Sequence, residues 1–232
     1  MISGVVPADR RVRTTVVACG ALGPELAASL RQAGLEALVD LHCLPPDLHN
    51  TPSDIPERVR AEIRAARVRG DEVVVGYADC GTGGRLDAVC AEEGVDRLPG
   101  AHCYELFAGA RTFAGLHAAE PGTFYLTDFL ARSFDRLVVR GLGLDRHPEL
   151  REIYFGNYRR LVHLAQSDDP DLDRRARAAA EVLGLVHERV ATGLQPFAHA
   201  LEQAIVAAHQ TAETEPDPPR GAAGSPLSGA AG

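Results

Sequence analysis

Short apolar segments alternate with helical patterns along the first third of the chain. Strand-like runs occupy residues 12–18, 35–41 and 72–75, and helical spacing of apolar residues occupies 24–30 and 53–69. This strand–helix–strand–helix–strand order predicts a parallel sheet with right-handed crossovers. We therefore predict an α/β fold, a three-layer sandwich in which a mostly parallel sheet has helices on both faces.

The chain continues this strand–helix order to about residue 210. We predict strands at 95–98, 123–126, 137–139, 160–165 and 185–190, and helices at 104–119 (broken at Gly109), 128–134, 171–183 and 196–210. From residue 211 onward, Pro, Gly, Ala, Ser and Glu leave little apolar surface to bury. The predicted organisation is a flexible N-terminus over 1–12, a single α/β domain over 13–210 and a disordered tail over 211–232.

Charge and composition exclude several classes of function. The net charge is −8, and no basic stretch stands out, which argues against a nucleic-acid partner. All 24 basic residues are Arg, so lysine Schiff-base chemistry and a P-loop lysine are both excluded. No apolar run approaches the roughly 20 residues of a membrane span, and no signal-peptide pattern is evident. We expect a cytoplasmic protein that does not bind membranes and whose five cysteines are reduced.

Three cysteines follow predicted strands, each close to a glycine turn or a histidine. Cys19 ends the first strand, Cys80 follows the strand at 72–75, and Cys103 lies beside His102. Because the carboxyl ends of parallel strands meet at one edge of a sheet, these thiols can converge. Thiolates and imidazoles drawn from separate strands are typical of an open catalytic zinc site. We predict Cys19, Cys80, Cys103 and His102 as metal ligands, with His49 as the alternative to His102. The ion is zinc or another transition metal.

Two alternatives to a metal site remain open. One of the cysteines can act as a nucleophile without any metal, and small cysteines can also simply fill tight turns and the core.

Two further residues are candidates for acid–base roles. Asp79 adjoins Cys80, and His49 lies in the loop after the second strand, on the predicted edge that carries Cys19 and Cys80. The alternative for His49 is a solvated loop histidine. We predict Asp79 and His49 as catalytic residues.

An anionic ligand or cofactor is predicted at two places. The turn that contains Gly81, Thr82 and Gly83 can present backbone N–H groups to an anion. Arg146 lies just before a helix that begins near Pro148, where positive charge and a helix N-terminus coincide. The alternative for both places is ordinary helix capping.

The arrangement of these motifs resembles a bacterial and archaeal domain family of unknown function. The motifs are Cys19-Gly20, His49-Asn50-Thr51-Pro52, Tyr77-Ala78-Asp79-Cys80, Ala101-His102-Cys103 and Pro121-Gly122-Thr123-Phe124-Tyr125. The resemblance covers roughly residues 14 to 210. It departs at His102 and Cys103, which are adjacent here, whereas some members place an acidic residue between them. The resemblance implies no established activity, although some members are encoded near corrinoid-dependent methyl-transfer systems.

Three functions are consistent with these observations. The first is a metal–thiolate enzyme, with zinc as the metal, that acts on a small thiol or anionic substrate in methyl or one-carbon transfer. The second is a non-catalytic accessory protein that binds a metal or a corrinoid and partners a methyltransferase or corrinoid protein. The third is a metal-free cysteine-dependent transferase.

Overall fold

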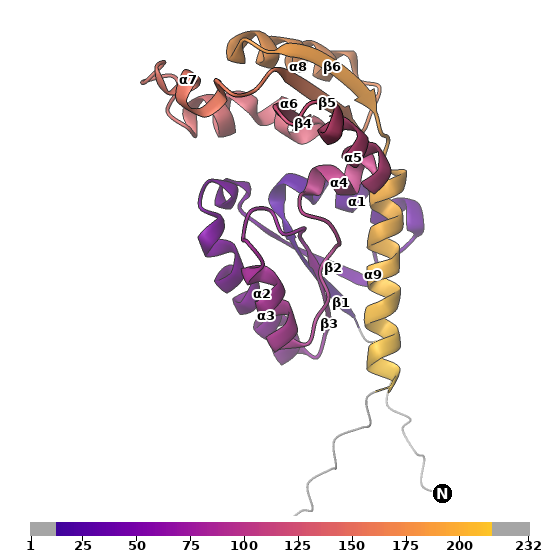
Figure 1. Cartoon of the computed structure of the whole chain (residues 1–232). Coiled ribbons are helices and arrows are strands. Elements are labelled where there is room, and N and C mark those ends of the chain that lie inside the picture. The colour runs from indigo at the N-terminus through magenta and orange to yellow at the C-terminus, as the bar shows by residue number, and fades with distance from the viewer. Residues whose placement is uncertain (1–12, 215–232) are drawn as a thin grey trace, which may run out of the picture.

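The protein contains two three-stranded parallel sheets, seen in a computed structural model that describes residues 13–214 (Figure 1). The first sheet has the order β2-β1-β3, with β1 at Thr14–Cys19, β2 at Val39–Leu44 and β3 at Glu72–Gly76. All six residues of β1 are buried, because β1 is the central strand and both of its faces are covered.

Helices cover the two faces of the first sheet. After the short turn η1 (Gly20–Leu22), helix α1 (Gly23–Ala33) connects β1 to β2. The turns η2 (Pro46–Asn50) and η3 (Pro52–Asp54) then lead into α2 (Ile55–Arg69), which packs beside α3 (Arg85–Glu93). Helix α2 ends at Gly70, whose φ of 81° lies in the left-handed region that glycine adopts without strain.

The second sheet has the order β4-β5-β6, with β4 at Thr123–Thr127, β5 at Arg160–Ala165 and β6 at Val186–Ala191. Helices α4 (Cys103–Ala108) and α5 (Ala110–Ala119) pack on one of its faces. The opposite face packs against α6 (Asp128–Phe134) and α8 (Pro170–Leu183). The π-helix η4 (Asp135–Arg140) continues α6, and α7 (Leu150–Phe155) follows.

The last helix, α9 (Gln195–Thr214), returns to the first sheet (Figure 1). Its side chains Phe197, Leu201 and Ile205 are part of the apolar core built on β1 and β3. The second sheet is therefore an insertion between the first sheet and the helix that completes it.

The α/β class, the parallel strands and the helices on both faces are confirmed, while the strands divide between two sheets. The predicted break at Gly109 is also found, between α4 and α5. The strand predicted at 137–139 is wrong, because those residues continue α6 as a π-helix that buries Val138. The segment at 95–98 makes one isolated bridge, between Val75 and Arg97.

The predicted ends of the chain lie mainly outside the described residues. Helix α9 continues to Thr214, past the start of the predicted tail at 211, while the flexible segment 1–12 and residues 215–232 are not described. Within 13–214, no helix has the length and apolar character needed to cross a bilayer.

Candidate functional site

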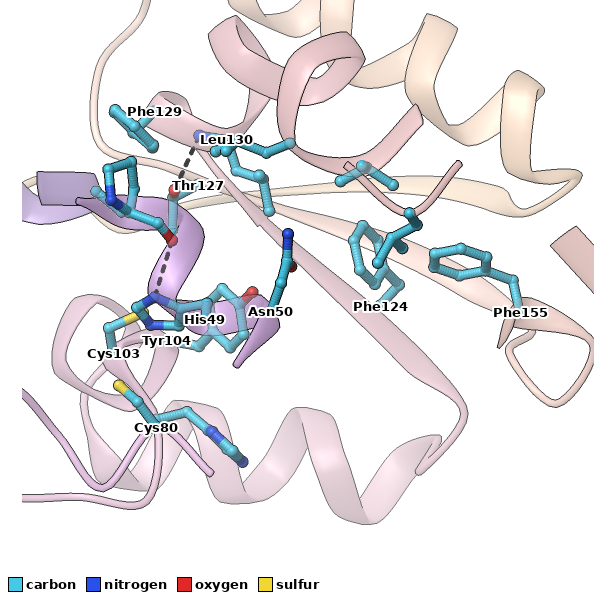
Figure 2. Close-up of a pocket in the computed structure, with 16 residues that line it drawn as sticks. His49, Asn50, Cys80, Cys103, Tyr104, Phe124, Thr127, Phe129, Leu130 and Phe155 are labelled. Carbon is cyan, nitrogen blue, oxygen red and sulfur yellow. Dashed lines mark hydrogen bonds between the residues drawn. The ribbon is translucent and has the colours of Figure 1, made fainter. Parts of the chain in front are cut away.

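A cavity of about 320 Å³ lies between the loops at the carboxyl ends of the first sheet's strands and the elements β4, α6, η4 and α7. Figure 2 shows Cys80, Cys103 and His49 close together on one side of it and Phe124 and Phe155 on the other. The first group comes from the loops at the carboxyl ends of β2 and β3 and from the start of α4, and the aromatic residues come from the second sheet and α7. The lining residues are Ala21, Pro46, His49, Asn50, Cys80, His102, Cys103, Tyr104, Phe124, Thr127, Phe129, Leu130, Leu137, Val138, Leu142 and Phe155.

Cys19 lies behind His49, at the end of β1. Its Sγ accepts a hydrogen bond from the backbone N–H of Ala21 at 3.3 Å and lies 3.7 Å from Nδ1 of His49. The same Nδ1 is 3.2 Å from the carbonyl oxygen of Pro46. The ring of His49 stacks on Tyr77, with ring centroids 6.4 Å apart. These contacts fix the imidazole between a buried thiol and the cavity.

Cys80 occupies a strained turn immediately after the Tyr77-Ala78-Asp79 segment. Its φ is 49°, and among the described residues it is the one non-glycine residue at positive φ. This conformation costs an ordinary L-residue about 1–2 kcal/mol. Backbone hydrogen bonds from Asp79 N to Gly100 O (3.2 Å) and from Cys80 N to Ala101 O (2.9 Å) hold the turn. Strain at a cysteine that lines a cavity is typical of a functional site.

Hydrogen bonds among the thiols and the imidazole change their pKa values strongly. Hydrogen bonding with Cys103, and then with His49, lowers the pKa of Cys80 to about 5, although burial opposes this change. Burial lowers the pKa of His49, but hydrogen bonds to Cys19 and Cys80 outweigh it and raise that pKa to about 10. The pKa of Cys103 rises well above its usual value, because its proton is held toward Cys80 and the thiol is buried. The arrangement favours a Cys80 thiolate paired with a His49 imidazolium.

Cys103 and His102 both reach the cavity. Cys103 begins α4, and His102 is the extended residue immediately before that helix, so their side chains are not forced to opposite sides. His102 is exposed, and its ring centroid is 6.3 Å from that of Tyr104. His102 therefore lies at the mouth of the cavity, outside the row of contacts Cys19–His49–Cys80–Cys103.

The cysteines and histidines of the cavity do not form a closed metal cage in the part of the chain that the structure describes. No three of their ligand atoms lie within 4.8 Å of one another. Among the described residues, His163, Asp173 and His187 do have ligand atoms that close together. An ion held by Cys19, Cys80, Cys103 and His49 or His102 would require side-chain rotations. The four soft donors nevertheless share one edge of the fold.

Asp79 points into its own loop. Its carboxylate accepts hydrogen bonds from Thr82 Oγ1 (2.5 Å), Gly83 N (3.1 Å) and Gly84 N (2.9 Å). These bonds lower the pKa of Asp79 against the opposing effect of burial. The Asp79 carboxylate therefore occupies the anion site that was predicted at residues 81–83. Its hydrogen bonds also hold the turn that contains Cys80 in place.

Arg146 lies at the surface, and neither it nor Asp79 lines the cavity. The Arg146 side chain is 73 % exposed, with Nε 3.8 Å from Oδ1 of Asp145. An anion in the cavity would therefore have to be bound by other groups.

The apolar half of the cavity had no counterpart in the sequence-based site. Phe124 packs edge-on against Phe155, with centroids 5.4 Å apart and planes at 87°, and Leu130 and Leu142 complete this wall. Phe124, Leu130 and Phe155 come from β4, α6 and α7, and Leu142 comes from the turn after η4, so no local spacing connects them to the cysteines.

Comparison with known proteins gives a family for the chain. The model of a family described as "Protein of unknown function (DUF1638)" matches residues 43–201. That segment contains His49, Cys80 and Cys103 together with the apolar wall. No curated protein and no solved structure matches the chain. The chain belongs to the DUF1638 family.

Proposed function

We propose that this protein is a cysteine-dependent transferase in which Cys80 is the reacting group. The observation that carries the proposal is the position of Cys80, between His49 and Cys103 at the wall of a cavity of about 320 Å³. A thiolate paired with an imidazolium is the arrangement that activates a cysteine nucleophile at neutral pH.

The proposed step is a substitution at an electrophilic carbon of the substrate. The Cys80 sulfur forms a C–S bond, the bond from that carbon to the leaving group breaks, and the leaving group departs with the electron pair. His49 supplies a proton to the leaving group, and a second nucleophile later displaces the carbon group from Cys80 as the thiolate is regenerated. Small acyl groups, the one-carbon formyl group among them, suit this chemistry, because the second nucleophile readily displaces the thioester that they form with Cys80.

The cavity favours a small substrate with an apolar part. Its volume of about 320 Å³ is at the lower end of the roughly 300–1,000 Å³ range of small-molecule sites. Phe124, Leu130 and Phe155 supply apolar surface opposite the thiolate. These features favour a small molecule over a corrinoid macrocycle as the ligand of this cavity.

A second candidate function is that of a zinc–thiolate enzyme at the same place. The specific observation in its favour is the donor set, since Cys19, Cys80, Cys103 and His49 make a row of contacts along one edge. Three thiolates and an imidazole are ligands that zinc prefers. If three of these four donors held the ion, the fourth position would be open to a substrate thiol, whose pKa the metal would lower.

Residue-resolved alkylation tests the proposal. Iodoacetamide is reacted with the native full chain at pH 4 to 10, with and without EDTA, and mass spectrometry measures labelling at each cysteine. We expect Cys80 labelling to rise with a midpoint near pH 5 and to stay level up to pH 9. Cys43 is the internal control: burial and the neighbouring Cys19 raise its pKa, so its labelling should rise only above about pH 9.

The outcomes separate the two candidates. The test uses the midpoint of the pH profile and not the rate of alkylation. A thiolate with a lower pKa is also a weaker nucleophile, so Cys80 need not react faster than an ordinary cysteine. A Cys80 midpoint near that of an ordinary thiol, at about 8.5, contradicts the nucleophile proposal. Protection of Cys80 that EDTA removes, together with one equivalent of zinc by elemental analysis, supports the zinc enzyme instead.

A further inference from the structure

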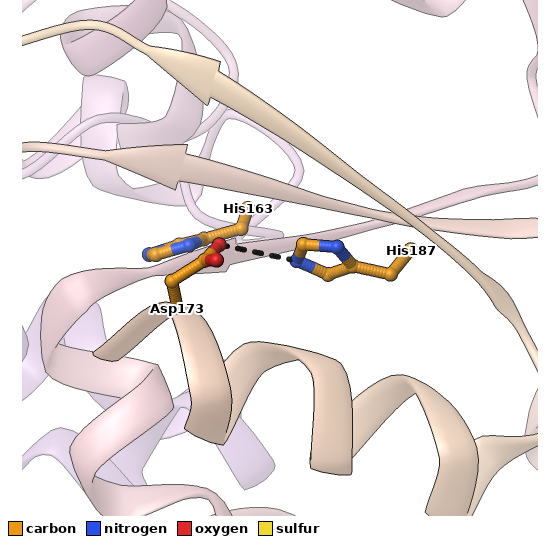
Figure 3. Close-up of side chains that lie close together, drawn as sticks. All are labelled: His163, Asp173 and His187. Atoms are coloured by element: carbon orange, nitrogen blue, oxygen red, sulfur yellow. Dashed lines mark ion pairs between the residues drawn. The ribbon is translucent and has the colours of Figure 1, made fainter. Parts of the chain in front are cut away.

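A second group of ligand atoms lies in the other half of the molecule, beneath the second sheet. His163 on β5 and His187 on β6 point toward Asp173, which lies in the first turns of α8 (Figure 3). One nitrogen of each ring and one oxygen of the carboxylate all lie within 4.8 Å of one another. His187 Nε2 is 3.9 Å from Asp173 Oδ1.

The three atoms that face one another have no hydrogen-bond partner. They are Nδ1 of His163, Oδ1 of Asp173 and Nε2 of His187, and each is buried. A buried polar atom without a hydrogen-bond partner destabilises the fold, so three such atoms that lie together need an explanation. A bound cation would satisfy all three.

In His163 and Asp173 the second polar atom is already hydrogen-bonded, which orients the unpaired one. His163 is 1 % exposed, and its Nε2 lies 3.0 Å from Oδ1 of Asp128. With Nε2–H donating to that carboxylate, Nδ1 of His163 carries a lone pair directed at Asp173 and His187. A carboxylate behind a histidine is the common support of a histidine that binds a metal.

The carboxylate of Asp173 likewise has one oxygen that accepts hydrogen bonds and one that does not. Oδ2 accepts hydrogen bonds from Nε and Nη2 of Arg177, at 3.2 and 3.0 Å. Oδ1 has no such bond; Nε of Arg189 is 3.9 Å away, and that guanidinium donates to Asp168 at 2.8 Å. Arg177 and Arg189 hold the carboxylate in place while one of its oxygens stays directed at the two imidazoles.

We propose that His163, Asp173 and His187 bind one divalent transition-metal ion, with zinc as the best match. Two imidazoles and one carboxylate are a ligand set known for zinc, and a fourth position remains for water. Ligand atoms around one tetrahedral zinc are about 3.4 Å apart, so small side-chain rotations close the site. This site is separate from the cysteine cavity and does not depend on the function proposed for it.

The test measures zinc binding in a chain from which two of the competing thiols have been removed. EDTA-treated full chain carrying Cys19→Ser and Cys80→Ser is titrated with zinc against a chromophoric chelator. We expect one equivalent to bind. Adding Asp173→Asn and His187→Gln should remove that equivalent or weaken the affinity at least 100-fold. His147→Gln is the matched control, because His147 also pairs with a carboxylate, at 3.3 Å from Glu149, but is exposed.

Two results overturn the inference. One is less than a tenth of an equivalent of zinc in the background chain, and the other is unchanged binding after the Asp173 and His187 substitutions. Far-UV circular dichroism in EDTA verifies that each variant is folded. If the double-serine background fails to fold, cobalt(II) in the native-cysteine chain separates the two sites. Thiolate ligation gives intense sulfur-to-metal absorption, whereas nitrogen and oxygen ligands give only weak visible bands, which the Asp173 and His187 substitutions should abolish.

Discussion

The backbone at Cys80 has a left-handed conformation that glycine tolerates and alanine does not. Because Gly and Ala both remove the thiol, comparing the two variants isolates the strain of that conformation. We expect Cys80→Gly to be more stable than Cys80→Ala by about 1 kcal/mol in urea unfolding. Equal stabilities would mean that the turn is not strained, and a stability gain over wild type would show that strain is maintained for function.

The low pKa of Cys80 depends on its neighbours Cys103 and His49. Removing either hydrogen-bond partner should raise that pKa from about 5 toward the ordinary thiol value of about 8.5. In Cys103→Ala and in His49→Gln, the midpoint of Cys80 alkylation should therefore move to higher pH. Cys90→Ala is the control, since burial raises the pKa of Cys90 to about 11 and it takes no part in the cavity. An unmoved midpoint in both variants contradicts the ion-pair account.

At the level of single residues, the sequence predicts which side chains lie close together more reliably than it predicts the role of each. Cys19 and Cys80 follow parallel strands, so their common edge is dictated by the fold, and His49 reaches it from the next loop. The role of Asp79 could not be predicted, because its carboxylate turns back onto Gly83 and Gly84 through loop geometry that no spacing encodes.

Helix α6 is joined to the second sheet through its first residue, Asp128. Burial raises the pKa of Asp128, but hydrogen bonds from His163 and Ser167 outweigh this effect, and the pKa is lower than usual. A carboxylate with a lowered folded-state pKa stabilises the fold above its unfolded pKa of about 3.9, and this contribution is lost as the pH falls through the folded value.

We therefore expect Asp128→Asn to be destabilised relative to wild type at neutral pH. The difference should shrink as the pH falls below about 4, where wild type loses the contribution of the carboxylate. Urea unfolding at pH 7, 5 and 3 measures it. Asp168→Asn, whose side chain is 95 % exposed, is the control and should change stability little at any of these pH values. A pH-independent difference for Asp128→Asn contradicts the assignment.

At the level of elements, strand and helix types are predictable where local pattern and capping agree. Thr127, the last residue of β4, accepts a hydrogen bond from Leu130 N and caps α6, a role that threonine commonly has at a helix N-terminus. Residues 137–139 are β-branched and apolar, yet they are helical because α6 continues directly into them and buries Val138. The division into two sheets depends on long-range strand pairing. On the edge of β3 that faces away from β1, the described residues form a single bridge, between Val75 and Arg97.

The whole molecule depends on the return of α9 to the first sheet. Leu201 is 1 % exposed and packs in the core with β1 and β3, whereas Val206 on the same helix is 53 % exposed. We expect Leu201→Ala to lower the free energy of unfolding by about 2–5 kcal/mol and Val206→Ala to change it by less than about 0.5 kcal/mol. Similar losses for the two variants would show that α9 is not a structural part of the first core.

The position of α9 also bears on the order in which a growing polypeptide can mature on the ribosome. The strands of the first sheet emerge early, but one of their faces remains uncovered until the helix that begins at Gln195 has been synthesised. At about 5–20 residues per second, synthesis of the intervening second sheet leaves that face uncovered for several seconds or more. A chain that stops before residue 195 therefore lacks the helix that covers this apolar face of the first sheet.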